Sequence, residues 1–163
     1  MLFDGTDGEI YSSELDPGEL RVIDVACNSG CLAPPHEIDV QGISIGGGFR
    51  LTSDVPVLAY QWNPFGSVEE AATDASLLLP ATSLREFYIT AAWGIGPSID
   101  YVENWTTYSQ LTVVAIADET TVSFVPSVDI PSLGGVGPFA AGIASASLTL
   151  DTFDVVSLSP AVR

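Results

Sequence analysis

The sequence has almost no positive charge and contains no lysine. Its basic residues are Arg21, Arg50, Arg85 and Arg163, against 21 acidic residues, which gives a formal net charge of −17. A chain with this charge repels the phosphates of nucleic acids and the headgroups of anionic lipids, so neither is an expected partner. The absence of lysine also excludes a phosphate-binding P-loop of the usual kind.

Cysteine and histidine are scarce as well. Cys27, Cys31 and His36 are the whole supply, and they cannot complete a tetrahedral zinc site without carboxylates. The two cysteines lie four positions apart, which differs from the C-x-x-C spacing of cytosolic redox pairs. We therefore expect a Cys27–Cys31 disulfide, which would contribute about 2 kcal/mol across so small a loop. Two free thiols are the alternative.

The sequence has no complete catalytic set. Gly42-Ile43-Ser44-Ile45-Gly46 matches the G-x-S-x-G pattern of serine hydrolases, which needs a strand-to-helix elbow and a later acid and histidine. Two further glycines follow and oppose a helix, while His36 precedes Ser44 and lies after two prolines, in a loop. A serine without a general base is not a nucleophile. We therefore predict no catalytic residue, no cofactor and an exposed His36, and we interpret the stretch around Ser44 as a glycine-rich turn between strands.

A metal site is not expected either. Residues 4–9 place three carboxylates beside two glycines, which is a composition that calcium loops share. The spacing is not that of an EF-hand, which needs acids at alternate positions and a glutamate twelve residues along. We interpret this stretch as a solvated turn.

Long hydrophobic runs are missing. Residues 130–150 carry no charge, but they are rich in Gly, Ser, Pro and Ala and lack the sustained large apolar residues that cross a bilayer. We predict a glycine-rich loop followed by a strand there, and no membrane insertion. The first four residues have neither the basic nor the apolar region of a secretory leader.

What the sequence does contain is a series of strand signals. It is 47% hydrophobic and 15% charged, with 15 glycines and 11 prolines, as is typical of a β protein with short strands and many turns. Short turns of helix are expected at 67–72 and 81–86. The predicted strands cover 19–25, 49–52, 55–62, 76–79, 87–93, 110–117, 121–126, 146–150 and 153–158.

Two of these predictions are specific. Residues 55–62 are apolar enough for a strand buried on both faces. Residues 110–117 alternate, with Leu111, Val113 and Ala115 on one face, and the next strand places Val122 and Phe124 on one face. The short connection between these two strands predicts a β-hairpin.

The order of the strand motifs resembles a known family. The motifs are Phe49 to Pro64, with Ser53-Asp54-Val55-Pro56-Val57 inside it, then Thr73 to Pro80, Ser83 to Ile89, Leu111 to Ala115 and Thr120 to Phe124. In this order they resemble the IgGFc-binding protein N-terminal domain family over most of residues 10–158. In that family the Ser-Asp-x-Pro-Val strand recurs after the later hairpin. Its single copy here, together with the missing lysine, implies a truncated module from a bacterial source.

The resemblance implies an extracellular or cell-surface location and a role in binding or adhesion. It carries no residue set onto this chain, so ligand-binding residues and the oligomeric state stay unassigned. The candidate binding surfaces are the Cys27–Cys31 loop and the aromatic segment 93–108. The expected function is a binding module for protein or glycan, not an enzyme. The alternatives are a structural spacer and, more distantly, a carboxylate-dependent glycoside hydrolase.

The expected fold is all-β, built as an antiparallel β-sandwich or paired β units, with a propeller-like arrangement of short sheets as the alternative. We predict a single partial module over 1–163. A division into two β subunits, 1–93 and 110–163 joined by 94–109, is the alternative organisation.

Overall fold

The computed structural model describes residues 1–3, 8–23, 42–63, 74–91, 110–143 and 146–160, and it confirms the all-β class. Every regular element in these ranges is a strand, apart from one short 3₁₀ helix. The chain divides into two compact units: Met1–Leu51 together with Thr90–Arg163, and Thr52–Ile89. The predicted subunits 1–93 and 110–163 remain a prediction.

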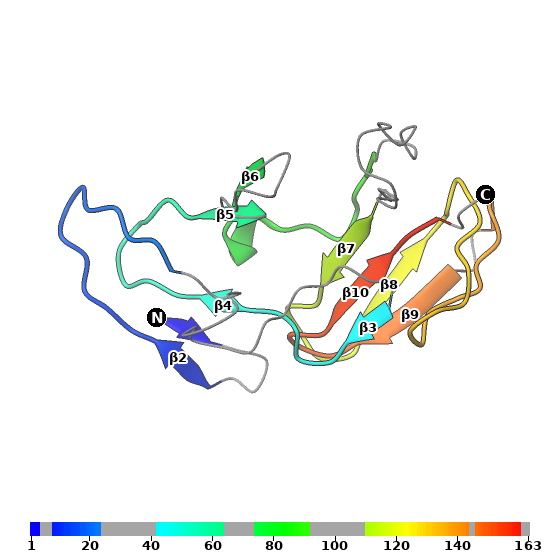
Figure 1. Cartoon of the computed structure of the whole chain (residues 1–163), viewed down its shortest axis with the longest axis horizontal. Coiled ribbons are helices and arrows are strands. Elements are labelled where there is room, and N and C mark those ends of the chain that lie inside the picture. The colour runs from blue at the N-terminus through cyan, green and yellow to red at the C-terminus, as the bar shows by residue number, and fades with distance from the viewer. Residues whose placement is uncertain (4–7, 24–41, 64–73, 92–109, 144–145, 161–163) are drawn as a thin grey trace, which may run out of the picture. The chain divides into compact units, whose positions relative to one another are not determined.

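A two-layer sandwich forms the main part of the first unit (Figure 1). One layer has the strand order β3-β10-β7, made of Gly42–Ser44, Val155–Leu158 and Leu111–Val114. The other layer pairs β8, Thr120–Phe124, with β9, Ala146–Leu150. All of these pairings are antiparallel.

The sandwich core is filled from both layers. Strand alternation turns every second residue inward, so Leu111, Val113, Val122 and Phe124 lie against the buried centre, as predicted. Complete burial of such a side chain is worth roughly 1.5–3 kcal/mol, and these partly buried residues gain a fraction of it. The buried members of the core are Ala115, Ile130, Val136, Leu150, Val156 and Leu158.

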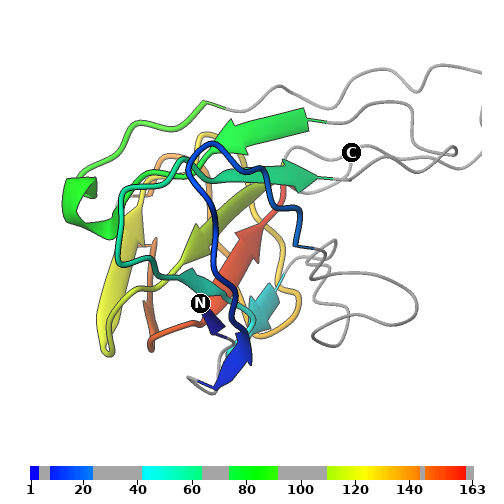
Figure 2. The same ribbon diagram turned by 90° about the vertical axis from the view of Figure 1, so that its left-hand side faces the viewer.

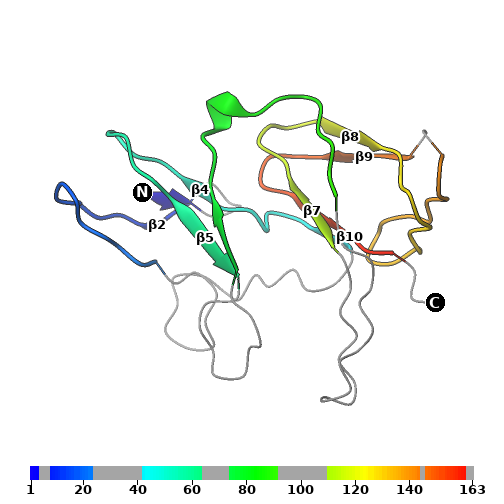
Figure 3. The ribbon, with the colours of Figure 1, turned by 90° about the horizontal axis from the view of Figure 1, so that it is seen from above.

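The predicted hairpin between the strands at 110–117 and 121–126 is wrong. β7 pairs with β10 and β8 pairs with β9, so the chain crosses between layers after β7 and again after β9. We call these two crossings the arch turns; they lie side by side in Figures 1 and 3. A hairpin would have set the two apolar faces beside each other in one sheet. The crossings let those faces oppose each other and share one core.

β10 is the central strand of its sheet, and all four of its residues are buried. Val156 and Leu158 face the core, while Ser157 lies on the other face with none of its surface exposed. The Gln110 side-chain amide donates a hydrogen bond to the Ser157 hydroxyl, which satisfies this buried polar group.

The connection between β8 and β9 is the predicted glycine-rich loop. Leu133 and Val136 exchange two backbone hydrogen bonds around Gly134 and Gly135. Both glycines have positive φ, 59° and 82°, as a two-residue type I′ turn requires. Val136 is buried in the sandwich core, so this turn closes one side of it.

A small sheet, β2-β1-β4, completes the first unit; its strands are Glu9–Tyr11, Leu2–Phe3 and Arg50–Leu51. The Arg50 guanidinium lies 4.7 Å from the Phe3 ring centroid and 5.6 Å from that of Phe153. These cation–π contacts join the small sheet to the turn between β9 and β10. The predicted strand at 19–25 is not formed over its described residues, 19–23.

The second unit is a hairpin followed by a short helix. β5, Tyr60–Asn63, pairs with β6, Asp74–Leu77, and the 3₁₀ helix η1 covers Ala81–Ser83 (Figure 2). The helical turn predicted at 81–86 therefore forms, although it is shorter than expected. The helix predicted at 67–72 lies outside the described residues.

Two strand predictions in the second unit need correction. Residues 55–59 are not in a strand, and Val55, Val57, Leu58 and Tyr60 are exposed rather than buried. Residues 87–91 form no strand. Both stretches are apolar, but among the described residues of this unit no second layer packs against them.

Candidate functional site

The G-x-S-x-G stretch is a strand and a turn. Ser44 ends β3 opposite Val155, and Gly46, with φ of 63°, begins the turn toward β4. A Cβ atom on Gly42 would lie 3.0 Å from the Gly134 carbonyl oxygen. The glycines therefore serve close backbone approach and turn geometry. The predicted glycine-rich turn forms from residue 45 onward, whereas Gly42–Ser44 lie in strand β3 and not in that turn.

Several predicted features fall outside the described part of the chain. These are His36, Cys27 and Cys31, the aromatic segment 93–108, and residues 4–7 of the acidic stretch. Within the described ranges, no group of three or more His, Cys, Asp or Glu residues is arranged to hold a metal ion.

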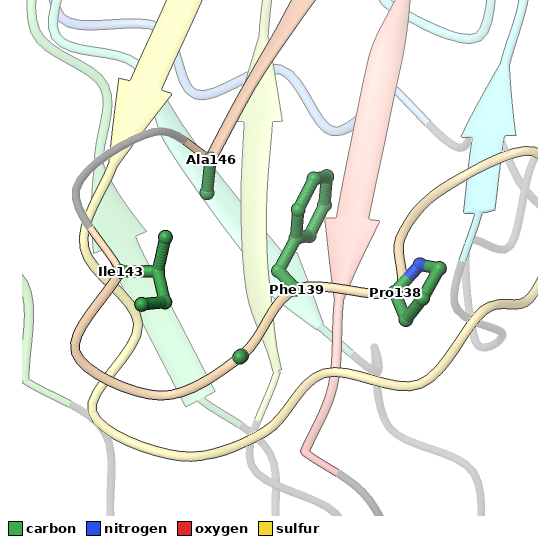
Figure 4. Close-up of a pocket in the computed structure, with 5 residues that line it drawn as sticks. Pro138, Phe139, Ile143 and Ala146 are labelled. Carbon is green, nitrogen blue, oxygen red and sulfur yellow. The ribbon is translucent and has the colours of Figure 1, made fainter.

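A hollow of about 240 Å³ opens beside the loop that precedes β9. The side chains of Phe139, Ile143 and Ala146 gather around it, with Pro138 at one side (Figure 4). The Phe139 ring packs edge-on against Phe124, with 5.0 Å between ring centroids, so this wall is held by the sandwich core. Because its lining contains no ionisable side chain, the hollow suits apolar contact and offers no acid or base for chemistry.

The larger apolar feature is one face of the β5–β6 hairpin. Tyr60 and Leu77 are directly opposite each other, so they share a face, whereas the neighbouring pair, Gln61 and Ser76, lies on the other face. The Leu78 N–H donates to the Ala59 carbonyl at 2.9 Å and extends the pairing. Strand alternation then adds Leu58 and Leu79 to the apolar face.

We call Leu58, Tyr60, Leu77 and Leu79 the hairpin surface. Leu58 is 80% exposed and Leu79 is 64% exposed. Contiguous exposed apolar groups of this kind mark interaction sites in soluble proteins. Sequence reasoning missed this surface because the same apolar residues also predict a buried strand.

A second exposed segment lies at the end of this unit. Phe87, Tyr88 and Ile89 are all exposed, and the Tyr88 hydroxyl accepts a hydrogen bond from the Arg85 backbone N–H at 2.9 Å. That bond holds the tyrosine ring back against its own chain. The adjacent phenylalanine and isoleucine carry the apolar surface of this segment.

The fold and these surfaces define an all-β module whose exposed features are suited to binding. Residues 74–162 match the family described as IgGFc binding protein, and this match covers more than half of the chain. The chain therefore belongs to the IgGFc binding protein family, which is a family of binding domains. No curated protein and no solved structure matches the chain. Among the described residues, no helix is long and apolar enough to cross a membrane.

Proposed function

We propose that this chain is an extracellular or cell-surface binding module of a larger protein, and that it binds a protein ligand through the hairpin surface. Family membership supports a binding role, and the family description names a protein as the ligand. The observation that carries the proposal is the shared, exposed apolar face that Tyr60 and Leu77 build with Leu58 and Leu79.

The composition of this surface fits a protein interface. Tyrosine is enriched among the residues that dominate binding energy, because its ring buries a large apolar area with few rotatable bonds. Fully covering one of the neighbouring leucines is worth about 1.5–3 kcal/mol. Four such side chains are enough to anchor an interface whose polar rim sets specificity.

The charge of the chain limits the choice of partner. A net charge of −17 favours a ligand with basic residues around its contact area, and it disfavours an acidic one. This electrostatic attraction acts mainly on the association rate of the two proteins, and it weakens as salt screens the charges. We therefore expect binding that slows as the salt concentration rises.

Binding is tested with the immobilised chain against the IgG Fc fragment, a protein array and a glycan array. Any protein ligand found is then measured with the double variant Tyr60→Ser, Leu79→Ser. We expect affinity to fall at least tenfold, which corresponds to about 1.4 kcal/mol. Leu20→Ser is the matched control, because Leu20 is 88% exposed and belongs to the other unit; it should bind normally.

The possible results separate the alternatives. A protein ligand whose affinity is unchanged by the double variant would place the site elsewhere and refute the hairpin surface. Glycan binding alone would refute a protein ligand. No binding to the Fc fragment, the protein array or the glycan array would favour a structural spacer.

A further inference from the structure

Three aspartates fasten the two arch turns to each other and to the turn after β3. We call Asp118, Asp151 and Asp154 the aspartate clasp. Asp118 lies in the turn between β7 and β8, and the other two lie in the turn between β9 and β10. These turns lie beside each other at one end of the sandwich (Figure 3).

The first two aspartates bind reciprocally across the arch turns. The Thr152 N–H donates to Asp118 Oδ1 at 3.1 Å, and the Glu119 N–H donates to Asp151 Oδ1 at 2.9 Å. Each turn therefore supplies one carboxylate and one amide to the other. Neither bond belongs to a strand ladder. Two backbone bonds between Ala115 and residues 153–154 join the bases of the same turns, so the aspartates act on the tips.

Asp154 uses both of its carboxylate oxygens. Oδ2 accepts from the Asp151 N–H at 3.0 Å, and Oδ1 accepts from the Gly46 N–H at 3.0 Å. The first bond tightens the β9–β10 turn itself. The second joins that turn to the glycine turn between β3 and β4, 108 positions away in sequence.

The clasp also holds unusual backbone conformations. Glu119 and Phe153 have φ of 55° and 70°, a region that costs energy for any residue other than glycine. Glu119 donates directly to the clasp, and Phe153 lies between Thr152 and Asp154. Releasing the Asp151 carboxylate would therefore let Glu119 relax, whereas Phe153 is also held by the bond from its own N–H to the Ala115 carbonyl at 3.0 Å.

We propose that the aspartate clasp is an acid-sensitive latch. Ionised, it fixes the tips of the two arch turns and the turn after Ser44. Protonated, it loosens these tips, while the backbone bonds of Ala115 and Gly48 to residues 153–154 and the sandwich core persist. An ionised carboxylate is purely an acceptor and makes charge-assisted bonds about twice as strong as neutral ones. The core cluster consists of apolar residues, so acid does not act on it directly.

Two opposing effects set the sign of the pH response. Glu119 is the acidic neighbour of Asp118 in the same turn, and the partial desolvation of the Asp118 carboxylate acts to raise its pKa. Arg50 carries the positive charge nearby, stacked over Phe153. At Asp118 the hydrogen bonds prevail: those from the Thr152 side chain and N–H hold the pKa of Asp118 below its ordinary value.

A lowered pKa in the folded state fixes the direction of the response. The stabilisation from Asp118 is complete above the unfolded value of about 3.9 and is lost as pH falls through the lower folded value. Acid also relieves the general repulsion of a chain at −17. Global stability is therefore a poor readout of the latch, and individual backbone amides are the right one.

The test is amide hydrogen exchange by NMR on the full 163-residue chain between pH 7 and pH 2, expressed as protection factors. We expect protection at Gly46, Glu119 and Thr152 to fall several-fold by pH 2, while Val113 and Val156 in the core strands keep theirs. The variant Asp118→Asn, Asp151→Asn retains the acceptor oxygens but cannot titrate, so Glu119 and Thr152 should lose their pH dependence.

Asp129→Asn is the matched control. Asp129 accepts a comparable bond from the Ala141 N–H at 2.9 Å, in the β8–β9 loop and outside the clasp. This variant should leave the response of the clasp amides unchanged. Unchanged protection at pH 2 would overturn the latch. So would an undiminished response in the double asparagine variant, or loss of protection throughout the core together with the turns.

Discussion

At the residue scale, Gly42 shows why a motif has to be judged by its backbone. Its φ is 148°, and a Cβ atom there would lie 3.0 Å from the Gly134 oxygen and 3.1 Å from its Cα. Both neighbours are backbone atoms, which cannot swing aside as a flexible side chain does. Together with Ile43, whose N–H donates to the same oxygen at 3.0 Å, this glycine seats β3 against the β8–β9 loop.

Gly42→Ala should therefore destabilise the protein by about 2 kcal/mol, since it combines an unfavourable φ with an overpacked contact. Urea unfolding monitored by tryptophan fluorescence measures the loss. Gly135→Ala is the control, because Gly135 also has positive φ but open space around it; it should cost about 1 kcal/mol. Equal losses in the two variants would show that the close approach to Gly134 does not matter.

At the element scale, the sequence predicted which face of a strand each residue occupies better than it predicted which strands pair with each other. Alternation at 111–115 and 122–124 identified the inward side chains correctly, since strand periodicity alone determines which face a residue occupies. It did not determine that β7 joins β10, because pairing depends on strands distant in sequence. The hairpin surface shows the same limit: Leu58 and Tyr60 are apolar, but burial depends on what packs against them.

The arch topology can be tested by a cross-link between β7 and β10. Thr112 and Ser157 are paired residues in these strands, whereas a β7–β8–β9–β10 meander would hold them apart. With Cys27→Ser and Cys31→Ser as background, Thr112→Cys, Ser157→Cys should oxidise to a disulfide that mass spectrometry detects. Thr112→Cys, Ser147→Cys is the control, since these residues lie in different layers and should stay reduced. A free thiol pair in the first variant would contradict the arches.

At the scale of the whole molecule, the dominant property is the net charge of −17. Mutual repulsion among the acidic side chains opposes compaction, and this repulsion extends over the Debye length, about 30 Å at 0.01 M salt but about 8 Å at 0.15 M. The net charge could be predicted from composition alone, because it depends on the numbers of acidic and basic residues and not on their contacts. By contrast, the stability that the apolar core contributes should rise only slightly when sodium chloride is added.

Raising sodium chloride from 0.01 M to 0.5 M should therefore increase the melting temperature, by about 3 °C if screening returns about 1 kcal/mol to a domain of this size. Differential scanning calorimetry at pH 7 measures the shift. Glu14→Gln, Glu86→Gln provides the comparison, since both residues are exposed and their loss lowers the charge. That variant should melt higher in low salt and gain less from added salt, because less repulsion is left to screen. A melting temperature that falls with salt, or an equal gain in both proteins, would mean that specific ion pairs outweigh the general repulsion.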